Sequence, residues 1–96
     1  MAAYCIFDIL EITDKPKMAE YRRRVRATVE QYGGRYLVAG GDFDVVEGNW
    51  RPVFPVILEF PSLEQARRWY NSPEYQPLKK LRHDATRSNG VFIEGV

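Results

Sequence analysis

The chain has almost no cysteine or histidine. Cys5 is the only cysteine and His83 the only histidine among 96 residues. One cysteine excludes a disulfide within the chain and any zinc site built on paired thiolates. Cys5 stands among apolar residues, which favours a buried, unreactive thiol over a nucleophile. One histidine excludes a His-rich zinc site, so no metal site is expected, and no motif implies a cofactor.

Excess charge of one sign and long hydrophobic runs are also missing. Fourteen basic and thirteen acidic residues leave a net charge of +1, which gives no general attraction for nucleic acid or an anionic membrane. No secretion signal precedes the chain's first strand, and no apolar run approaches the length of a bilayer. We therefore expect a cytoplasmic protein with neither nucleic acid nor membrane as a partner.

The length and composition are those of one small globular domain spanning residues 1–96. With 45% hydrophobic and 28% charged residues, the chain has room for one core. A chain this short buries only about 60–65% of the surface that it exposes when unfolded. Its stability margin is thin, and dimerisation is one way to increase it.

The first half of the chain predicts a strand, a helix and further strands. Residues 3–12 are apolar on both alternating faces apart from Asp8 and Glu11, as in a central strand. Thr13 and Asp14 offer an N-cap for a helix that Gly33-Gly34 ends. The buried face of that helix is predicted from apolar residues spaced by three and four, which are Met18, Tyr21, Val25, Val29 and Tyr32.

Strand character returns at residues 35–39, 43–47 and 53–60. Gly40-Gly41 separates the first two segments, either as a tight hairpin turn or as a bulge in one bent strand. Residues 53–60 are apolar on both faces except for Glu59. A third strand buried on both sides is therefore expected.

The last third predicts a split helix and a final strand. Ser62 and Gln65 match a capping box, and the helix after them buries Ala66, Trp69 and Tyr70. A second short helix carries Leu78, Leu81 and Ala85, and Asn89-Gly90 leads into a strand at residues 91–93.

This order predicts an α+β domain of the βαββαβ kind. Right-handed crossovers place the helices on one face of a four-stranded antiparallel sheet. Because the first and third strands are apolar on both sides, the other face would expose more apolar surface than soluble monomers usually do. We therefore expect a homodimer in which a second copy covers that face.

Several short motifs along the chain resemble domain-of-unknown-function family 1330, of the dimeric α+β barrel superfamily. The resemblance implies a ferredoxin-like fold whose two subunits pack their sheets into a barrel, and no established activity. Many members have Arg where this chain has Ala39. The motifs are Tyr32-Gly33-Gly34-Arg35-Tyr36-Leu37-Val38, Gly40-Gly41, Glu47-Gly48-Asn49-Trp50, Glu59-Phe60-Pro61-Ser62, Trp69-Tyr70-Asn71-Ser72-Pro73-Glu74-Tyr75 and Glu94-Gly95.

Asp8 and Glu59 are the candidate catalytic residues, because each is ionisable within an apolar strand. Because the expected fold makes the first and third strands neighbours, both carboxylates could share a pocket, where desolvation raises a carboxyl pKa towards that of a general base. The alternative is that arginines hold each carboxylate in a structural ion pair.

Trp50, Arg82 and His83 are the candidate ligand-binding residues. Trp50 lies in a predicted loop, where its ring is expected at a dimer interface or a pocket rim. His83 follows Arg82 on the short helix and could act as a general base or hold a haem iron. The alternative is a histidine that simply faces solvent.

Two functions remain open. The first is a small-molecule-binding protein or enzyme, with a pocket between sheet and helices or near the dimer seam and with cofactor-free acid–base chemistry. The second is a non-catalytic ligand-binding or regulatory dimer. RNA binding on the open sheet is disfavoured, because Glu59 stands where a phosphate would have to approach.

Overall fold

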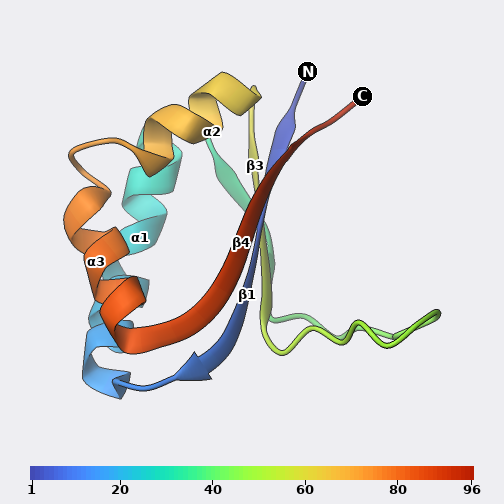
Figure 1. The fold of residues 1–96 in the computed structure, drawn as a ribbon. Coiled ribbons are helices and arrows are strands. Elements are labelled where there is room, and N and C mark those ends of the chain that lie inside the picture. The colour runs from blue at the N-terminus through green and yellow to red at the C-terminus, as the bar shows by residue number, and fades with distance from the viewer.

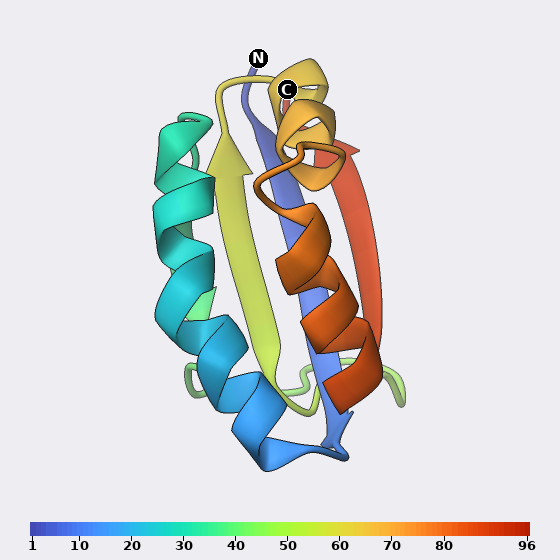
Figure 2. The same ribbon diagram turned by 90° about the vertical axis from the view of Figure 1, so that its left-hand side faces the viewer.

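The computed structural model describes residues 1–96 as an antiparallel four-stranded sheet with three helices on one face (Figures 1 and 2). The strand order is β2-β3-β1-β4. The predicted α+β, ferredoxin-like fold class is confirmed. The elements are β1 (Ala3–Ile12), α1 (Lys15–Gln31), β2 (Arg35–Ala39), β3 (Pro55–Phe60), α2 (Leu63–Tyr70), α3 (Gln76–Ala85) and β4 (Thr86–Glu94).

Strand β1 is central, as its two apolar faces predict. It pairs with β3 on one side and with β4 on the other. Cys5, Phe7 and Ile9 are buried, while the alternate residues are half-buried. The alternation follows from the period of two along a strand, which sends successive side chains to opposite faces.

Helix α1 begins and ends where the sequence predicts. The Asp14 carboxylate accepts a hydrogen bond from the Lys17 backbone N–H at 3.1 Å. At the other end, Gly33 has a φ of +80°, a conformation that favours glycine. The residues buried along α1 are Met18, Tyr21, Val25 and Val29, four of the five expected.

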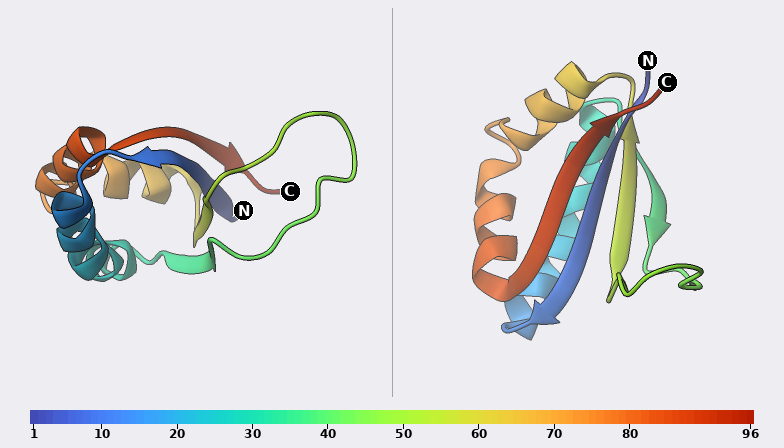
Figure 3. Two further views of the ribbon diagram at one scale, coloured as in Figure 1. Left: turned by 90° about the horizontal axis from the view of Figure 1, so that it is seen from below. Right: turned by 45° about the vertical axis from the view of Figure 1, so that its right-hand side comes forward.

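Residues 40–54 contain no helix or strand and form what we call the 40–54 arm. It extends away from the helices, beyond the sheet (Figures 1 and 3). The predicted strand at 43–47 is therefore wrong, and Gly40-Gly41 is neither a hairpin turn nor a bulge. The arm begins at Gly40, which has a φ of +71°. The Gly40 N–H donates a hydrogen bond to the Pro55 carbonyl oxygen at 2.7 Å, and this bond joins the two ends of the arm. Residues 43–47 have strand propensity but no neighbouring strand with which to pair.

The helices after β3 follow the prediction closely, with one difference at the cap of α2. The Ser62 hydroxyl accepts a hydrogen bond from the Gln65 N–H at 3.0 Å. The Gln65 side chain, however, donates to the Tyr32 carbonyl at 2.9 Å instead of returning to Ser62. Only half of the capping box forms, and the other half ties α2 to the end of α1.

Strand β4 is longer than the predicted 91–93, and Asn89-Gly90 lies within it. Gly90 is the register partner of Phe7 on β1. A Cβ atom at position 90 would stand 2.7 Å from Phe7 Cδ1, so the Phe7 ring occupies the space that a side chain would need. The glycine is therefore required by close packing, and no turn forms there.

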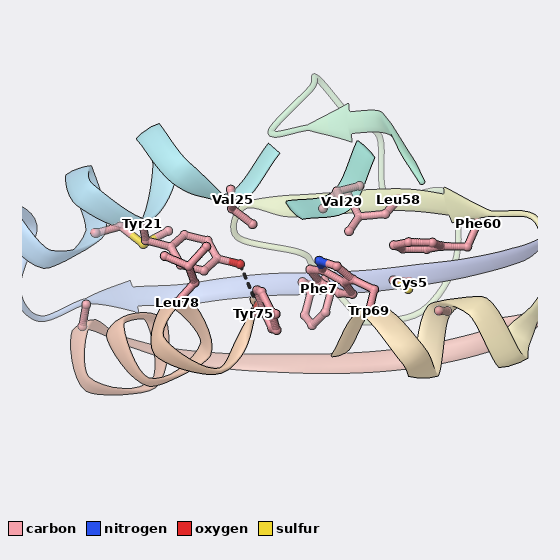
Figure 4. Packing of buried hydrophobic residues seen from close by; sticks show 13 residues of the cluster. Cys5, Phe7, Tyr21, Val25, Val29, Leu58, Phe60, Trp69, Tyr75 and Leu78 are labelled. Carbon is pink, nitrogen blue, oxygen red and sulfur yellow. Dashed lines mark hydrogen bonds between the residues drawn. The ribbon is translucent and has the colours of Figure 1, made fainter. Parts of the chain in front are cut away.

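The core lies between the sheet and the helices and is built around aromatic rings (Figure 4). Trp69 is fully buried, with ring centroids 4.2 Å from Tyr75 and 5.5 Å from Phe60. Its indole N–H donates to the Thr28 hydroxyl at 3.0 Å. Cys5 lies in the same layer, where burial raises its thiol pKa to about 12. The thiol is unreactive at neutral pH, as expected.

The sheet face away from the helices carries apolar side chains. Ile6 pairs in register with Ile57 on one side and Val91 on the other, so the three side chains share that face. Val91 and Ile93 are each 55% exposed. None of the helices is long and apolar enough to cross a membrane.

Candidate functional site

A cleft of about 620 Å³ lies along the edge strand β4, on the side of the sheet that the helices cover. It combines aromatic rings from the sheet and α2 with polar side chains from α3 and the start of β4. The lining residues are Phe7, Tyr70, Arg82, His83, Thr86, Arg87, Ser88, Gly90, Val91 and Phe92. The lining includes two arginines and a histidine but no acidic residue.

Three of the rings pack edge to face and form the apolar part of the cleft. The Phe92 centroid lies 6.2 Å from that of Phe7 and 5.4 Å from that of Tyr70. Gly90 leaves room for the Phe7 ring beside β4, which fixes how this wall is built. Such a wall suits a flat apolar group of a ligand.

Arg82 is the central polar group of the cleft. Helix α3 places it on the buried side together with Leu78 and Ala85, and only 5% of its surface is exposed. Its Nη1 donates to the Ser88 hydroxyl at 3.0 Å, and its guanidinium carbon lies 5.0 Å from the Phe7 ring centroid. The guanidinium is thus held between a hydroxyl and an aromatic face.

Two buried tyrosine hydroxyl groups, linked by hydrogen bonds, hold the guanidinium on the side facing the core. Arg82 Nε donates to the Tyr75 hydroxyl at 3.4 Å, and the Tyr75 and Tyr21 hydroxyl oxygens are 2.9 Å apart (Figure 4). Burial opposes the charge of Arg82, but the tyrosines outweigh this effect and raise its pKa above the ordinary value. The guanidinium is therefore charged, and its orientation is fixed from α1 and α3.

His83 stands beside Arg82 at the outer side of the cleft. Its Nε2 lies 3.5 Å from Nη2 of Arg82. Because arginine can only donate, a hydrogen bond at this long distance would require Nε2 as the acceptor, in a neutral imidazole. Burial lowers the His83 pKa, and the charges of Arg82 and Lys79 lower it further. A neutral imidazole at pH 7 can accept a proton.

Asp8 and Glu59 are not brought together. Both point away from the helices, but Glu59 pairs in register with Tyr4 and Asp8 pairs with Pro55. The antiparallel register separates the two carboxylates by four residues, roughly 13 Å along the strand. The shared pocket expected from the sequence does not form within one protomer, and neither residue lines the cleft.

Each of these carboxylates has a partner of its own. Glu59 Oε1 accepts a hydrogen bond from Arg35 Nε at 2.7 Å, which is the structural ion pair considered as the alternative. The Asp8 carboxylate instead accepts hydrogen bonds from the backbone N–H groups of Val53 at 2.9 Å and Phe54 at 2.8 Å. These bonds hold the end of the 40–54 arm against β1. A catalytic role for Asp8 and Glu59 stays a prediction.

Trp50 lies in the 40–54 arm, apart from the cleft. It is 78% exposed and borders a smaller hollow of about 250 Å³ with Phe43, Val46 and Pro52. Of the three candidate ligand-binding residues, the structure therefore brings Arg82 and His83 together and leaves Trp50 elsewhere. No group of three or more His, Cys, Asp or Glu side chains lies together as a metal site would require.

Three residues that line the cleft on β4 were not predicted as site residues. Thr86 and Ser88 do not stand out in the sequence because the last strand is expected to begin only after Asn89-Gly90, and Phe92 stands out only as a strand residue. The signal that could have found them is the alternation along 86, 88, 90 and 92, which places these residues on one face of an unbroken strand.

Solved structures that resemble this fold include the following three. A protein of unknown function from Rhodopseudomonas palustris matches with a TM-score of 0.76 at 19% identity, over 99% of this chain and 82% of its own. SnoaB, a cofactor-independent oxygenase from Streptomyces nogalater, matches with a TM-score of 0.59 at 10% identity, over 99% and 91%. A dimeric protein of unknown function with a ferredoxin-like fold from Bacteroides fragilis matches with a TM-score of 0.55 at 11% identity, over 98% and 96%.

At these identities the structures show that the fold is shared and nothing more. Comparison with curated proteins gives no match. The family model described as Domain of unknown function (DUF1330) matches residues 2–96, as the motifs predicted, and the chain belongs to that family.

Proposed function

We propose that this protein binds a small organic molecule in the β4 cleft and acts on it by acid–base chemistry through His83. The observation that carries the proposal is that three aromatic rings, a buried guanidinium and a neutral imidazole meet in one cleft. Its volume of about 620 Å³ lies within the range of small-molecule sites. The polar groups stand at one end of an apolar wall, as they do where a ligand must be oriented.

The chemistry follows from the positions of the two side chains. Nε2 of the neutral imidazole would give up its long contact with Arg82 Nη2 and take a proton from an acidic C–H or O–H group of the ligand. The negative charge that this leaves on the ligand would be stabilised by Arg82, whose guanidinium is already fixed in place. The competing function, a non-catalytic binding module, would use the same cleft without proton transfer.

Nuclear magnetic resonance on isotope-labelled protein tests both parts. Small aromatic compounds are added, and backbone shifts are expected to change at β4, α3 and the end of α2. For compounds that bind, exchange of their acidic protons in D2O is then followed with the wild type and with His83→Gln. Faster exchange with the wild type alone supports catalysis, whereas binding without faster exchange supports a binding module. Shift changes that never map to the cleft would overturn the proposal.

We further propose that the protein is a homodimer in which a second copy covers the open sheet face. The support is the apolar side chains of Ile6, Ile57 and Ile93 on that face and the dimeric state named for the relative from Bacteroides fragilis. Self-association of one apolar patch through a two-fold axis is the usual form of a dimer.

Light scattering at micromolar concentration tests this association. Ile93→Lys should yield a folded monomer, because it places a charge on the open face. Ala27→Lys, at an exposed position of α1 on the opposite side, is the matched control and should remain dimeric. A wild-type protein that is monomeric and binds no hydrophobic dye would contradict the proposal.

A further inference from the structure

Arg82 is a buried cation that has no carboxylate partner. Ion pairs elsewhere in the chain join surface arginines and lysines to acids, and Arg82 takes part in none of them. Its contacts are hydroxyl groups and one imidazole. Burying a charge is costly unless a counter-charge compensates it. The protein itself supplies no such charge at this position.

The hydrogen-bonding capacity of Arg82 is also incompletely used. A guanidinium has five N–H donors. Three contacts, with Tyr75, Ser88 and His83, account for three of them and leave two without a protein acceptor. Since Arg82 lines the cleft, an acceptor bound there would complete its set of partners.

The surroundings of Arg82 attract negative charge. The cleft lining adds a second cation, Arg87, beside the neutral imidazole of His83, and it contains no acid. The ion pair between Arg87 and Glu11 is long, at 3.6 Å, and both side chains are largely exposed to water. Lys79 lies over the ring of Tyr70, with Nζ 4.4 Å from the centroid, and adds a further positive charge at the rim.

We infer that the ligand of this cleft is an organic carboxylate on a flat apolar body, with the carboxylate on Arg82 and the body against Tyr70 and Phe92. The inference rests on the proposed function of the cleft and names its ligand class. A carboxylate matches the planar fork of a guanidinium with two parallel hydrogen bonds. The rings of the lining match the flat body.

A carboxylate fits better than a phosphate. One buried guanidinium compensates one negative charge, whereas a phosphate carries up to two and usually gathers several cations or backbone N–H groups. The other cationic side chain of the cleft, Arg87, is exposed, and so is the neutral imidazole of His83. A carboxylate bound to Arg82 would also raise the pKa of neighbouring His83, because its negative charge favours the imidazolium.

The test compares matched probes on the intact protein. Benzoate and cinnamate are titrated against benzamide and cinnamamide, which have the same shape without the charge. The acids are expected to bind in the cleft roughly 10- to 100-fold more tightly than the amides, as charge-assisted hydrogen bonds predict. Arg82→Gln should remove this preference, and Arg67→Gln, at an exposed position of α2, should keep it.

Each other result has a distinct meaning. Amides that bind in the cleft as tightly as the acids would overturn the carboxylate inference and leave the cleft as a binding site. Phenylphosphonate or inorganic phosphate binding more tightly than benzoate would overturn it in favour of a phosphate ligand. If other compounds bind in the cleft but no acid does, the ligand class is wrong, and if none binds, the proposed function fails. If Arg82→Gln does not fold, the role of Arg82 is tested with Arg82→Lys. The preference for a carboxylate is then tested by comparing acids with amides on the wild type.

Discussion

The positive charge of Arg82 disfavours protonation of its neighbour His83. As the only histidine, His83 gives one imidazole signal that can be titrated without assignment. Its pKa should lie below the ordinary value of 6.5, because burial and the positive charges of Arg82 and Lys79 disfavour the imidazolium more than Asp84 favours it. Proton magnetic resonance between pH 4 and pH 8 measures this value. Replacing Lys79 with Gln should move it upward, and a wild-type pKa above 6.5 would contradict the geometry described for the cleft.

The same shift links stability to pH. Since the folded pKa of His83 lies below the unfolded one, the unfolded chain binds the proton first as the pH falls. The contribution of His83 to stability is therefore complete above pH 6.5 and is lost as the pH falls through the folded pKa. His83→Gln should remove this part of the pH dependence of thermal unfolding.

The two linked tyrosine hydroxyl groups that hold Arg82 give a second prediction. Tyr21→Phe removes one buried hydrogen bond and should lower the free energy of unfolding by about 1 kcal/mol. Tyr75→Phe should lower it by roughly 2–3 kcal/mol, because it leaves both the Tyr21 hydroxyl and Nε of Arg82 without a partner. Urea denaturation measures the unfolding free energy of both variants. Equal losses in the two would mean that the hydrogen bonds from Tyr21 through Tyr75 to Arg82 are not coupled.

At the scale of elements, the edge strand β4 depends on a glycine. Gly90→Ala places a methyl group against the Phe7 ring, and we expect a loss of about 1–3 kcal/mol in unfolding free energy. The displaced ring also belongs to the cleft wall, so ligand binding should weaken together with stability. Gly41→Ala is the matched control, since its Cβ would meet nothing closer than 3.9 Å. A Gly90→Ala variant as stable as the wild type would show that Phe7 can move freely.

The elements that the sequence predicted well are those specified locally. For α1, the Asp14 cap, the spacing of its apolar residues and Gly33 all lie within the helix or at its ends. The 40–54 arm was mispredicted because a strand needs a neighbour, and strand propensity at 43–47 does not provide one. The predicted fold likewise placed Asp8 and Glu59 on neighbouring strands but could not give their separation, which depends on the register between β1 and β3.

The cleft was predictable only in part for the same reason. Arg82 and His83 could be named as candidates because they are adjacent on a short helix. That Arg82 is buried without an acid depends on Phe7 from β1 and on Tyr21 from α1, which lie far from it in the chain. The tertiary packing around Arg82, which the local sequence does not specify, makes this arginine a candidate binding residue.

At the scale of the whole molecule, the 40–54 arm is held to the sheet by Asp8. Asp8→Ala removes the acceptor of the Val53 and Phe54 N–H groups, so both should exchange with solvent faster. Asp8→Asn keeps one carbonyl oxygen in place and should largely preserve their protection. Hydrogen exchange followed by magnetic resonance distinguishes the variants. Equal protection in Asp8→Ala and the wild type would mean that the arm is fixed by other contacts, such as the bond from Gly40 to Pro55.

Trp50 makes the same arm a reporter of association. The other tryptophan, Trp69, is fully buried, whereas Trp50 is 78% exposed. If a second copy covers the arm in the proposed dimer, the emission of Trp50 should shift to shorter wavelength as the protein concentration rises. An emission spectrum that does not change across the dimerisation range would place the arm outside the interface.

The burial of Cys5 has a practical consequence for all these experiments. A thiol with a pKa of about 12 and no exposed surface does not compete for maleimide reagents at neutral pH. The natural chain can therefore serve as a cysteine-free background, and a single cysteine introduced in the arm or at the cleft rim would carry a spin label or fluorophore at one defined position.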